Sequence, residues 1–152
     1  MSNTQILTIG MVAHDRMKMP LREWVTTNVE VLAAHRFFAT GTTGRMLNDH
    51  LPQLNISALK SGPFGGDQQM GALIAEAKLD ALIFFQDVMT AQPHDVDVKA
   101  LVRLSVLFEV PVAFNRATAD MMVTSSMFGS KESMPEYPDA QEAFAGWLDR
   151  LK

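Results

Sequence analysis

One aspartate stands in a setting that suits a carboxylate for moving protons. Asp67 closes the run Ser61-Gly-Pro-Phe-Gly-Gly-Asp67, which contains three glycines and one proline in seven residues. Such a loop controls its backbone more tightly than a simple connection requires. The carboxylate can serve as a general base, or it can cap the following helix by accepting bonds from free N–H groups. Position in the sequence leaves both interpretations open.

A second acid lies three positions after a histidine, in the segment that contains His94 and Asp97. This spacing places both side chains on one face at the start of a helix. The pair can handle a proton, cap the helix or supply half of a metal site. No second spaced pair completes the coordination that zinc would need, so we expect no metal. His14, directly after an apolar run, is a better functional candidate than His35 or His50, which fall near helix ends where a solvated or capping histidine is usual.

A phosphate site is suggested by the turn Thr40-Gly-Thr-Thr-Gly44. The N–H groups at a helix N-terminus, together with the positive end of the helix dipole, favour an anion, and the threonine hydroxyls add donors. Lys18 can supply a point charge to the same group. The alternative is an ordinary strand-to-helix turn with a threonine cap, and a solvated surface lysine.

The elements that must position these residues alternate along the chain. Apolar runs predict five strands, at residues 6–13, 36–40, 55–59, 81–85 and 110–114, with helical periodicity between them. A last helix is expected after the cap Asp139, with Phe144, Trp147, Leu148 and Leu151 on its apolar face. This order predicts an α/β fold, a parallel sheet covered by helices on both faces. Every polar cluster named above follows a predicted strand, so all of them meet at the carboxyl edge, where open α/β sheets bind ligands.

Composition narrows the function classes. The chain has 152 residues, 47% of them hydrophobic and 20% charged, which suits one globular domain over residues 1–152. A formal charge of −4 without a basic cluster makes a nucleic-acid partner an unexpected one. No apolar run reaches the ~20 residues that span a bilayer. The absence of cysteine and of a basic, signal-like start favours a cytoplasmic protein.

Several strings resemble the methylglyoxal synthase family, and they occur in order from about Leu7 to Met121. They are Val12-Ala-His-Asp15, Ala39-Thr-Gly-Thr-Thr-Gly44, Ser61-Gly-Pro-Phe-Gly-Gly-Asp-Gln-Gln69, Pro93-His-Asp-Val-Asp-Val-Lys-Ala-Leu101 and Ala117-Thr-Ala-Asp120. An ordered series of motifs is far more specific than one glycine-rich loop. The segment from Thr124 to Asp139, and the residues Gln86 and Phe114, depart from the family pattern.

The resemblance implies a Rossmann-like three-layer sandwich with a five-stranded, mainly parallel sheet, usually assembled as a homohexamer. It implies conversion of dihydroxyacetone phosphate to methylglyoxal and phosphate without a metal or organic cofactor, with phosphate also a possible inhibitor. By position, Asp67, His94 and Asp97 match catalytic residues. The residues that match substrate or phosphate contacts are His14, Lys18, Thr40, Gly41, Thr42, Thr43, Ser61, Gly62 and the C-terminal Arg150.

Two other function classes remain to be compared with the enzyme. The same fold serves as a regulatory ligand-binding domain of carbamoyl phosphate synthetase, and such a domain would keep the threonine turn but lose the acids. This chain keeps Asp67, His94 and Asp97 together, which favours the enzyme. A generic Rossmann-type nucleotide binder is disfavoured, because the first strand ends in His-Asp and not in a G-x-G-x-x-G turn.

Overall fold

The sheet has five strands, and all of its strand pairs are parallel. The computed structural model describes residues 6–152, and within them the strand order is β3-β2-β1-β4-β5. The strands are β1 (Thr8–Ala13), β2 (Arg36–Ala39), β3 (Asn55–Ala58), β4 (Ala81–Phe85) and β5 (Val112–Ala113). β1 is central, with Met11 opposite Ala39 and Ala13 opposite Phe85. β1 and β4 therefore end level with each other, and β2 ends opposite Met11, just before them.

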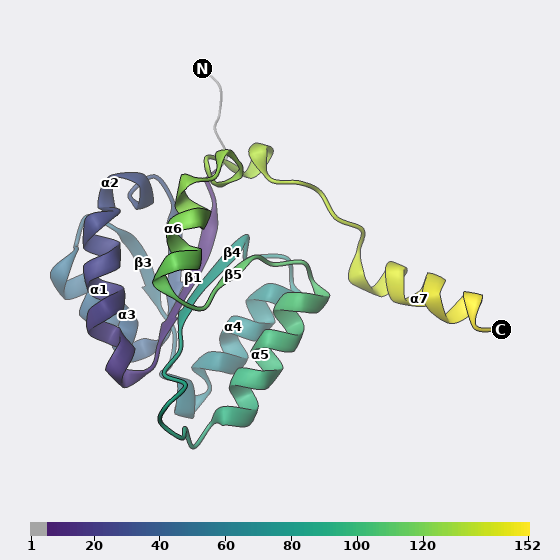
Figure 1. The fold of residues 1–152 in the computed structure, drawn as a ribbon, viewed down its shortest axis with the longest axis horizontal. Coiled ribbons are helices and arrows are strands. Elements are labelled where there is room, and N and C mark those ends of the chain that lie inside the picture. Colours follow the sequence, from purple (N-terminus) through teal and green to yellow (C-terminus); the bar gives the residue numbers. More distant parts are fainter. Residues whose placement is uncertain (1–5) are drawn as a thin grey trace.

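Helices cover both faces of the sheet, as predicted (Figure 1). One face carries α1 (Lys18–Thr27), α2 (Val29–Leu32), α3 (Gly41–His50) and α6 (Arg116–Thr124), and the other carries α4 (Gly66–Ala75) and α5 (Asp95–Leu107). β1 is buried on both sides because its residues alternate between the two apolar clusters, Met11 in the first and Val12 in the second. Each large apolar side chain buried in this way stabilises the fold by about 1.5–3 kcal/mol.

Some elements differ from their prediction for local reasons. The helical segment predicted between the first two strands is interrupted at Asn28, whose side-chain amide donates to the Trp24 carbonyl at 2.8 Å. The polar segment after the fifth strand forms α6, because the Asn115 side chain caps it by accepting from the Thr118 N–H at 2.9 Å. The interpretation of His35 as a solvated or capping residue was wrong: it is buried, and its Nδ1 accepts from the Leu7 N–H at 3.2 Å.

The last helix, α7 (Ala140–Arg150), extends away from the rest of the chain (Figure 1). Its predicted cap is confirmed, because the Asp139 carboxylate accepts from the N–H groups of Gln141 and Glu142 at 2.9 and 3.1 Å. Its apolar side chains, Phe144 and Trp147 among them, are exposed. Among residues 6–152 no helix combines the length and the apolar character needed to cross a membrane.

Candidate active site

A small cavity of about 150 Å³ lies at the carboxyl edge of the sheet. Segments that follow β1, β2, β3 and β4 all contribute to its wall. The lining residues are Val12, Ala13, His14, Asp15, Lys18, Thr40, Thr42, Ser61, Gly62, Pro63, Asp67, Gln92, Pro93 and His94. Most of the side chains singled out in the sequence are thus brought together, although they come from segments far apart in the chain.

Asp67 does not cap its helix. The N-cap of α4 is Gly65, which has a φ of +103°, a conformation that glycine adopts readily. Asp67 is the second residue of the helix. The Asp67 side chain is almost completely buried, and neither carboxylate oxygen has a hydrogen-bond partner. The position is fixed by Gly66, where a Cβ would lie 1.9 Å from the Lys60 carbonyl oxygen. The capping interpretation is therefore wrong, and the carboxylate is left free.

Burial raises the pKa of Asp67 above its ordinary value, because an ionised carboxylate loses its hydration there. The charge of Asp97 raises this pKa further, while His94 and His14 act in the opposite direction. A carboxylate with a raised pKa is a stronger base than an exposed aspartate. Enzymes commonly tune general bases in this way.

His94 faces Asp67 across a gap. Its Nε2 is 3.7 Å from Asp67 Oδ2, which is too long for a hydrogen bond. A Cβ built on Gly62 would lie 3.1 Å from both of these atoms. Glycine at position 62 therefore leaves the facing Asp67 carboxylate and His94 imidazole unobstructed in the cavity that all three residues line. A molecule bound in that cavity can contact both groups.

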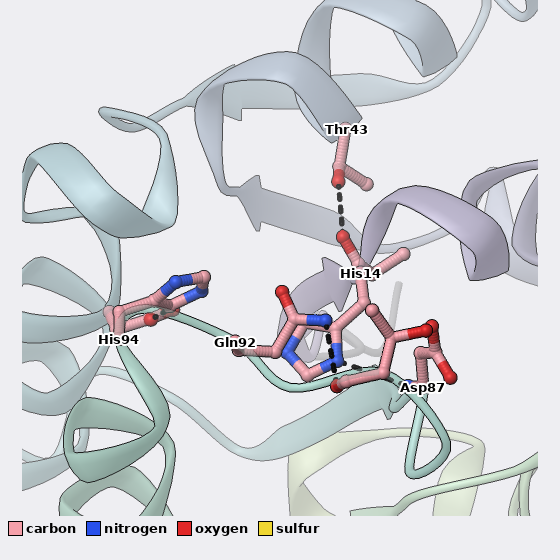
Figure 2. Close-up of polar contacts among 8 residues, drawn as sticks. His14, Thr43, Asp87, Gln92 and His94 are labelled. Carbon is pink, nitrogen blue, oxygen red and sulfur yellow. Dashed lines mark hydrogen bonds and ion pairs between the residues drawn. The ribbon is translucent and has the colours of Figure 1, made fainter.

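His14 lies between the threonine turn and the loop that carries Asp87, Gln92 and His94 (Figure 2). The main-chain N–H of Asp87 donates to its Nδ1 at 3.0 Å. The opposite ring nitrogen, Nε2, is buried and has no partner. Burial lowers the pKa of His14, and the neighbouring His94 lowers it further, while Asp67 and Asp87 act in the opposite direction. The lowered pKa and the bond accepted at Nδ1 both favour the neutral imidazole.

The cavity also carries donors suited to an anion. Lys18 forms an ion pair with Asp15 and lines the cavity together with Thr40, Thr42 and Ser61. Thr40 is the N-cap of α3, and its own side chain makes no capping bond. The first N–H groups of a helix have no partner within it, so this end presents both hydroxyl and amide donors.

Four predicted site residues do not line this cavity. Gly41 uses its N–H in a bond to the Lys60 carbonyl at 3.0 Å, and the buried Thr43 hydroxyl lies 3.5 Å from the Ala13 carbonyl oxygen (Figure 2). Asp97 lies instead in a groove between α4 and α5, where Asp67 forms part of the same wall. Arg150 is an exposed residue at the end of α7.

Several residues at the site had not been predicted as site residues, and two of them are polar residues of one loop. Gln92 lines the cavity, and Asp87 fixes His14 through its main-chain N–H. Both fall in the loop after the fourth strand, which the sequence marks as polar. A main-chain contact leaves no trace in residue type, so Asp87 could not have been identified from the sequence.

The buried, unpartnered side-chain atoms of the described residues gather in this one place. They are His14 Nε2, His94 Nδ1 and the two carboxylate oxygens of Asp67. Each such group costs about 1–3 kcal/mol, so a cluster of them is expected only where a ligand supplies the missing partners. A larger cavity of about 680 Å³ near β5 and α6 has Glu109 as its one charged lining residue, which does not suit an anionic ligand. Within residues 6–152 no group of three or more His, Asp or Glu side chains is arranged to hold a metal ion.

Comparisons with known proteins agree with this geometry. Residues 21–114 match the family model of the MGS-like domain. Methylglyoxal synthase of Oleidesulfovibrio alaskensis is 53% identical over 131 residues, which are 86% of this chain and 88% of the relative. Methylglyoxal synthase of Proteus mirabilis is 52% identical over 145 residues, which are 95% of this chain and 91% of that relative. The crystal structure of methylglyoxal synthase from Elizabethkingia anophelis NUHP1 superposes with a TM-score of 0.81 at 41% identity, over 94% of this chain and 90% of that one. The chain belongs to the methylglyoxal synthase family.

Proposed function

We propose that the chain converts dihydroxyacetone phosphate to methylglyoxal and inorganic phosphate through an enediolate. The observation that carries this proposal is the set of buried, unpartnered atoms on His14, Asp67 and His94, beside donors suited to a phosphate. A three-carbon phosphate ester would supply partners to both sets of groups at once. Family membership supports the same reaction.

Asp67 is the proposed base. It takes a proton from the hydroxymethyl carbon, and its raised pKa brings it closer to the strength that this step needs. Because Asp67 and His94 line the same cavity with Oδ2 and Nε2 3.7 Å apart, the reacting carbon can approach the carboxylate while its carbonyl oxygen approaches the imidazole. His94 then donates a hydrogen bond to the oxygen as negative charge develops on it.

Elimination follows from the enediolate. The electron pair of the hydroxyl O–H bond forms the aldehyde C=O bond, and the electron pair of the enediolate C=C bond moves to the neighbouring C–C bond. The C–O bond to phosphate then breaks, with its electron pair on the ester oxygen. The phosphate takes the hydroxyl proton, and Asp67 returns its proton to the terminal carbon, which becomes the methyl group. Lys18, Thr40 and Ser61 would hold the departing phosphate. Binding that keeps the breaking bond perpendicular to the enediolate plane favours elimination over isomerisation.

Asp97 is proposed to act through Asp67, because it shares the α4–α5 groove with that residue and does not line the cavity. Its negative charge contributes to the raised pKa of Asp67. In this role Asp97 adjusts the base and does not contact the substrate. The Asp97→Asn variant should accordingly shift the acidic limb of the kcat/KM profile to lower pH, whereas loss of a substrate contact would leave that limb in place.

Incubation with dihydroxyacetone phosphate tests the reaction directly. Methylglyoxal and inorganic phosphate are measured separately over time, and equal release of the two supports the proposal. Binding of the substrate without release of either product would instead indicate a regulatory phosphate-binding domain. Asp67→Asn should release neither product while still binding inorganic phosphate.

We further propose that copies of the chain assemble, with a homohexamer as the family expectation and the cytoplasm as the location. The exposed apolar face of α7 supports assembly, since large apolar side chains in solvent mark interaction surfaces. Phe144 and Trp147 stack on this face with ring centroids 5.6 Å apart. Sedimentation of the full chain should give a hexamer, and Trp147→Glu should dissociate it, whereas Glu142→Ala on the same helix should not. A hexamer that survives Trp147→Glu would remove α7 from the interface.

A further inference from the structure

The hydrogen bond between Asp87 and His14 decides where the His14 proton lies. A main-chain N–H can only donate, so Nδ1, which receives it at 3.0 Å, must carry a lone pair. A neutral imidazole has one N–H group, and in His14 it must therefore be on Nε2. This nitrogen is buried and without a partner, on a side chain that is 7% exposed and lines the cavity. His14 thus presents one unused donor.

The surroundings of His14 keep the ring neutral and in place. Its ring lies nearly perpendicular to those of Phe84 of β4 and His94, at centroid distances of 5.2 and 5.9 Å. The titratable groups facing it are His94, Asp67 on α4 and Asp87 after β4, and the balance of burial and these charges lowers its pKa. A protonated ring would also set two N–H groups against each other at Nδ1.

The position of His14 indicates which substrate atom it meets. It follows the central strand β1, with Thr40 at the end of the neighbouring β2 on one side and His94 after β4 on the other. A substrate with its phosphate beside Thr40 and its reacting carbons beside His94 has the ester oxygen that joins them between these two residues. That oxygen receives the electron pair when the C–O bond breaks.

We propose that His14 donates a hydrogen bond from Nε2 to this ester oxygen, with the main-chain N–H of Asp87 fixing the proton on that nitrogen. This inference rests on the proposed function. His14 keeps its proton, since a neutral imidazole is a hydrogen-bond donor here and not an acid, as is the neutral histidine of triosephosphate isomerase. The two histidines then have separate roles: His94 stabilises the enediolate oxygen, and His14 stabilises the leaving group.

The first test is spectroscopic and needs no substrate. Histidine labelled with ¹⁵N is introduced into the full chain, and the His14 signals are assigned by comparison with His14→Gln. We expect the pattern of a ring protonated on Nε2 alone, and we expect it to persist at pH values where an ordinary histidine, with a pKa of about 6.5, is half protonated. A ring protonated on Nδ1, or a doubly protonated ring at neutral pH, would overturn the proposal.

The second test separates proton abstraction from elimination. Reactions are run in D₂O, and deuterium entering the remaining dihydroxyacetone phosphate is compared with methylglyoxal formed. In His14→Leu, elimination should fall by about 10²-fold while deuterium exchange continues, because the enediolate forms but returns to substrate. In His14→Gln, whose amide N–H can reach the Nε2 position, elimination should partly recover. His94→Leu is the matched control, in which exchange and elimination should fall together.

Equal losses of exchange and elimination in His14→Leu, with an unchanged melting temperature, would refute a leaving-group role. A lower melting temperature with equal losses would indicate a structural role, and this also contradicts the proposal. If wild-type protein neither exchanges deuterium nor forms methylglyoxal, the proposed function fails, while the labelling experiment still decides the protonation of His14.

Discussion

The substitution Gly62→Ala adds one methyl group beside Asp67 and His94. In Gly62→Ala the new Cβ would lie 3.1 Å from Asp67 Oδ2, 3.1 Å from His94 Nε2 and 3.3 Å from His94 Cδ2. These contacts are tight, so the two side chains must move by a few tenths of an ångström, and the methyl group narrows the cavity beside them. Misplacement of reacting groups by about 1 Å costs about 10²-fold in rate, so we expect this smaller shift to lower kcat/KM by about 10-fold.

The same substitution should leave the fold intact. Gly62 does not have a positive φ, and alanine at a compatible position typically adds about 0.4–1 kcal/mol of stability, which offsets the tight contacts. The measurements are kcat/KM for methylglyoxal formation and the melting temperature at pH 7. Gly146→Ala is the control, because a Cβ there meets no atom within 4 Å. If Gly62→Ala retains wild-type kcat/KM, the proposed placement of the reacting atoms is wrong. If it loses activity only by unfolding, the steric reasoning is wrong.

Three further substitutions test the charge and the packing. Asp67→Asn should abolish turnover but raise the melting temperature at pH 7 by about 2–4 °C, because it removes a buried charge. The pKa of Asp67 is higher in the folded protein than in the unfolded chain, because the protonated form is favoured in the buried site. The stability that this protonated form provides is therefore lost as pH rises through the pKa of the folded protein. The gain measured for Asp67→Asn should therefore shrink on acidification, and a gain that is constant with pH would contradict the burial argument. Asp120→Ala should lower the free energy of unfolding by about 1–3 kcal/mol in denaturant titrations, since the buried Trp24 Nε1–H loses its acceptor at 2.8 Å, whereas Asp120→Asn should be nearly neutral. Gly66→Ala should yield little folded protein by circular dichroism, because its Cβ would overlap the Lys60 carbonyl oxygen.

The sheet could be predicted because its signals are local. Ala81–Phe85 is apolar throughout and matches β4 residue for residue, since a strand covered on both faces needs no polar position. The fifth strand was overestimated, because only Val112 and Ala113 pair with β4 at the sheet edge. α6 was missed because its capping residue, Asn115, resembles the end of a polar loop. Pairing partners and caps depend on contacts that the residue pattern shows only weakly.

The site could be predicted less evenly than the fold. Residue types and their place after strands identified Asp67, His94 and His14, which do share one cavity. Gly41 and Thr43 have suitable types, but their donors are directed to main-chain oxygens. Asp97 follows His94 at the expected helical spacing, yet a shared helical face does not specify which cavity a side chain enters.

The disagreement between local and global structure at Asp67 is itself informative. Aspartate in the first turn of a helix usually gains stability by accepting N–H bonds there, and Asp67 accepts none although it is buried. The loop makes this possible, because Gly65 takes the capping position with a positive φ and Gly66 lets the backbone pass against Lys60. The three glycines of the motif thus have separate tasks: one caps, one permits close approach, and Gly62 leaves the space beside the carboxylate. A sequence selected for stability alone would fill that space or bond that carboxylate, so the unfavourable arrangement points to the chemistry performed there.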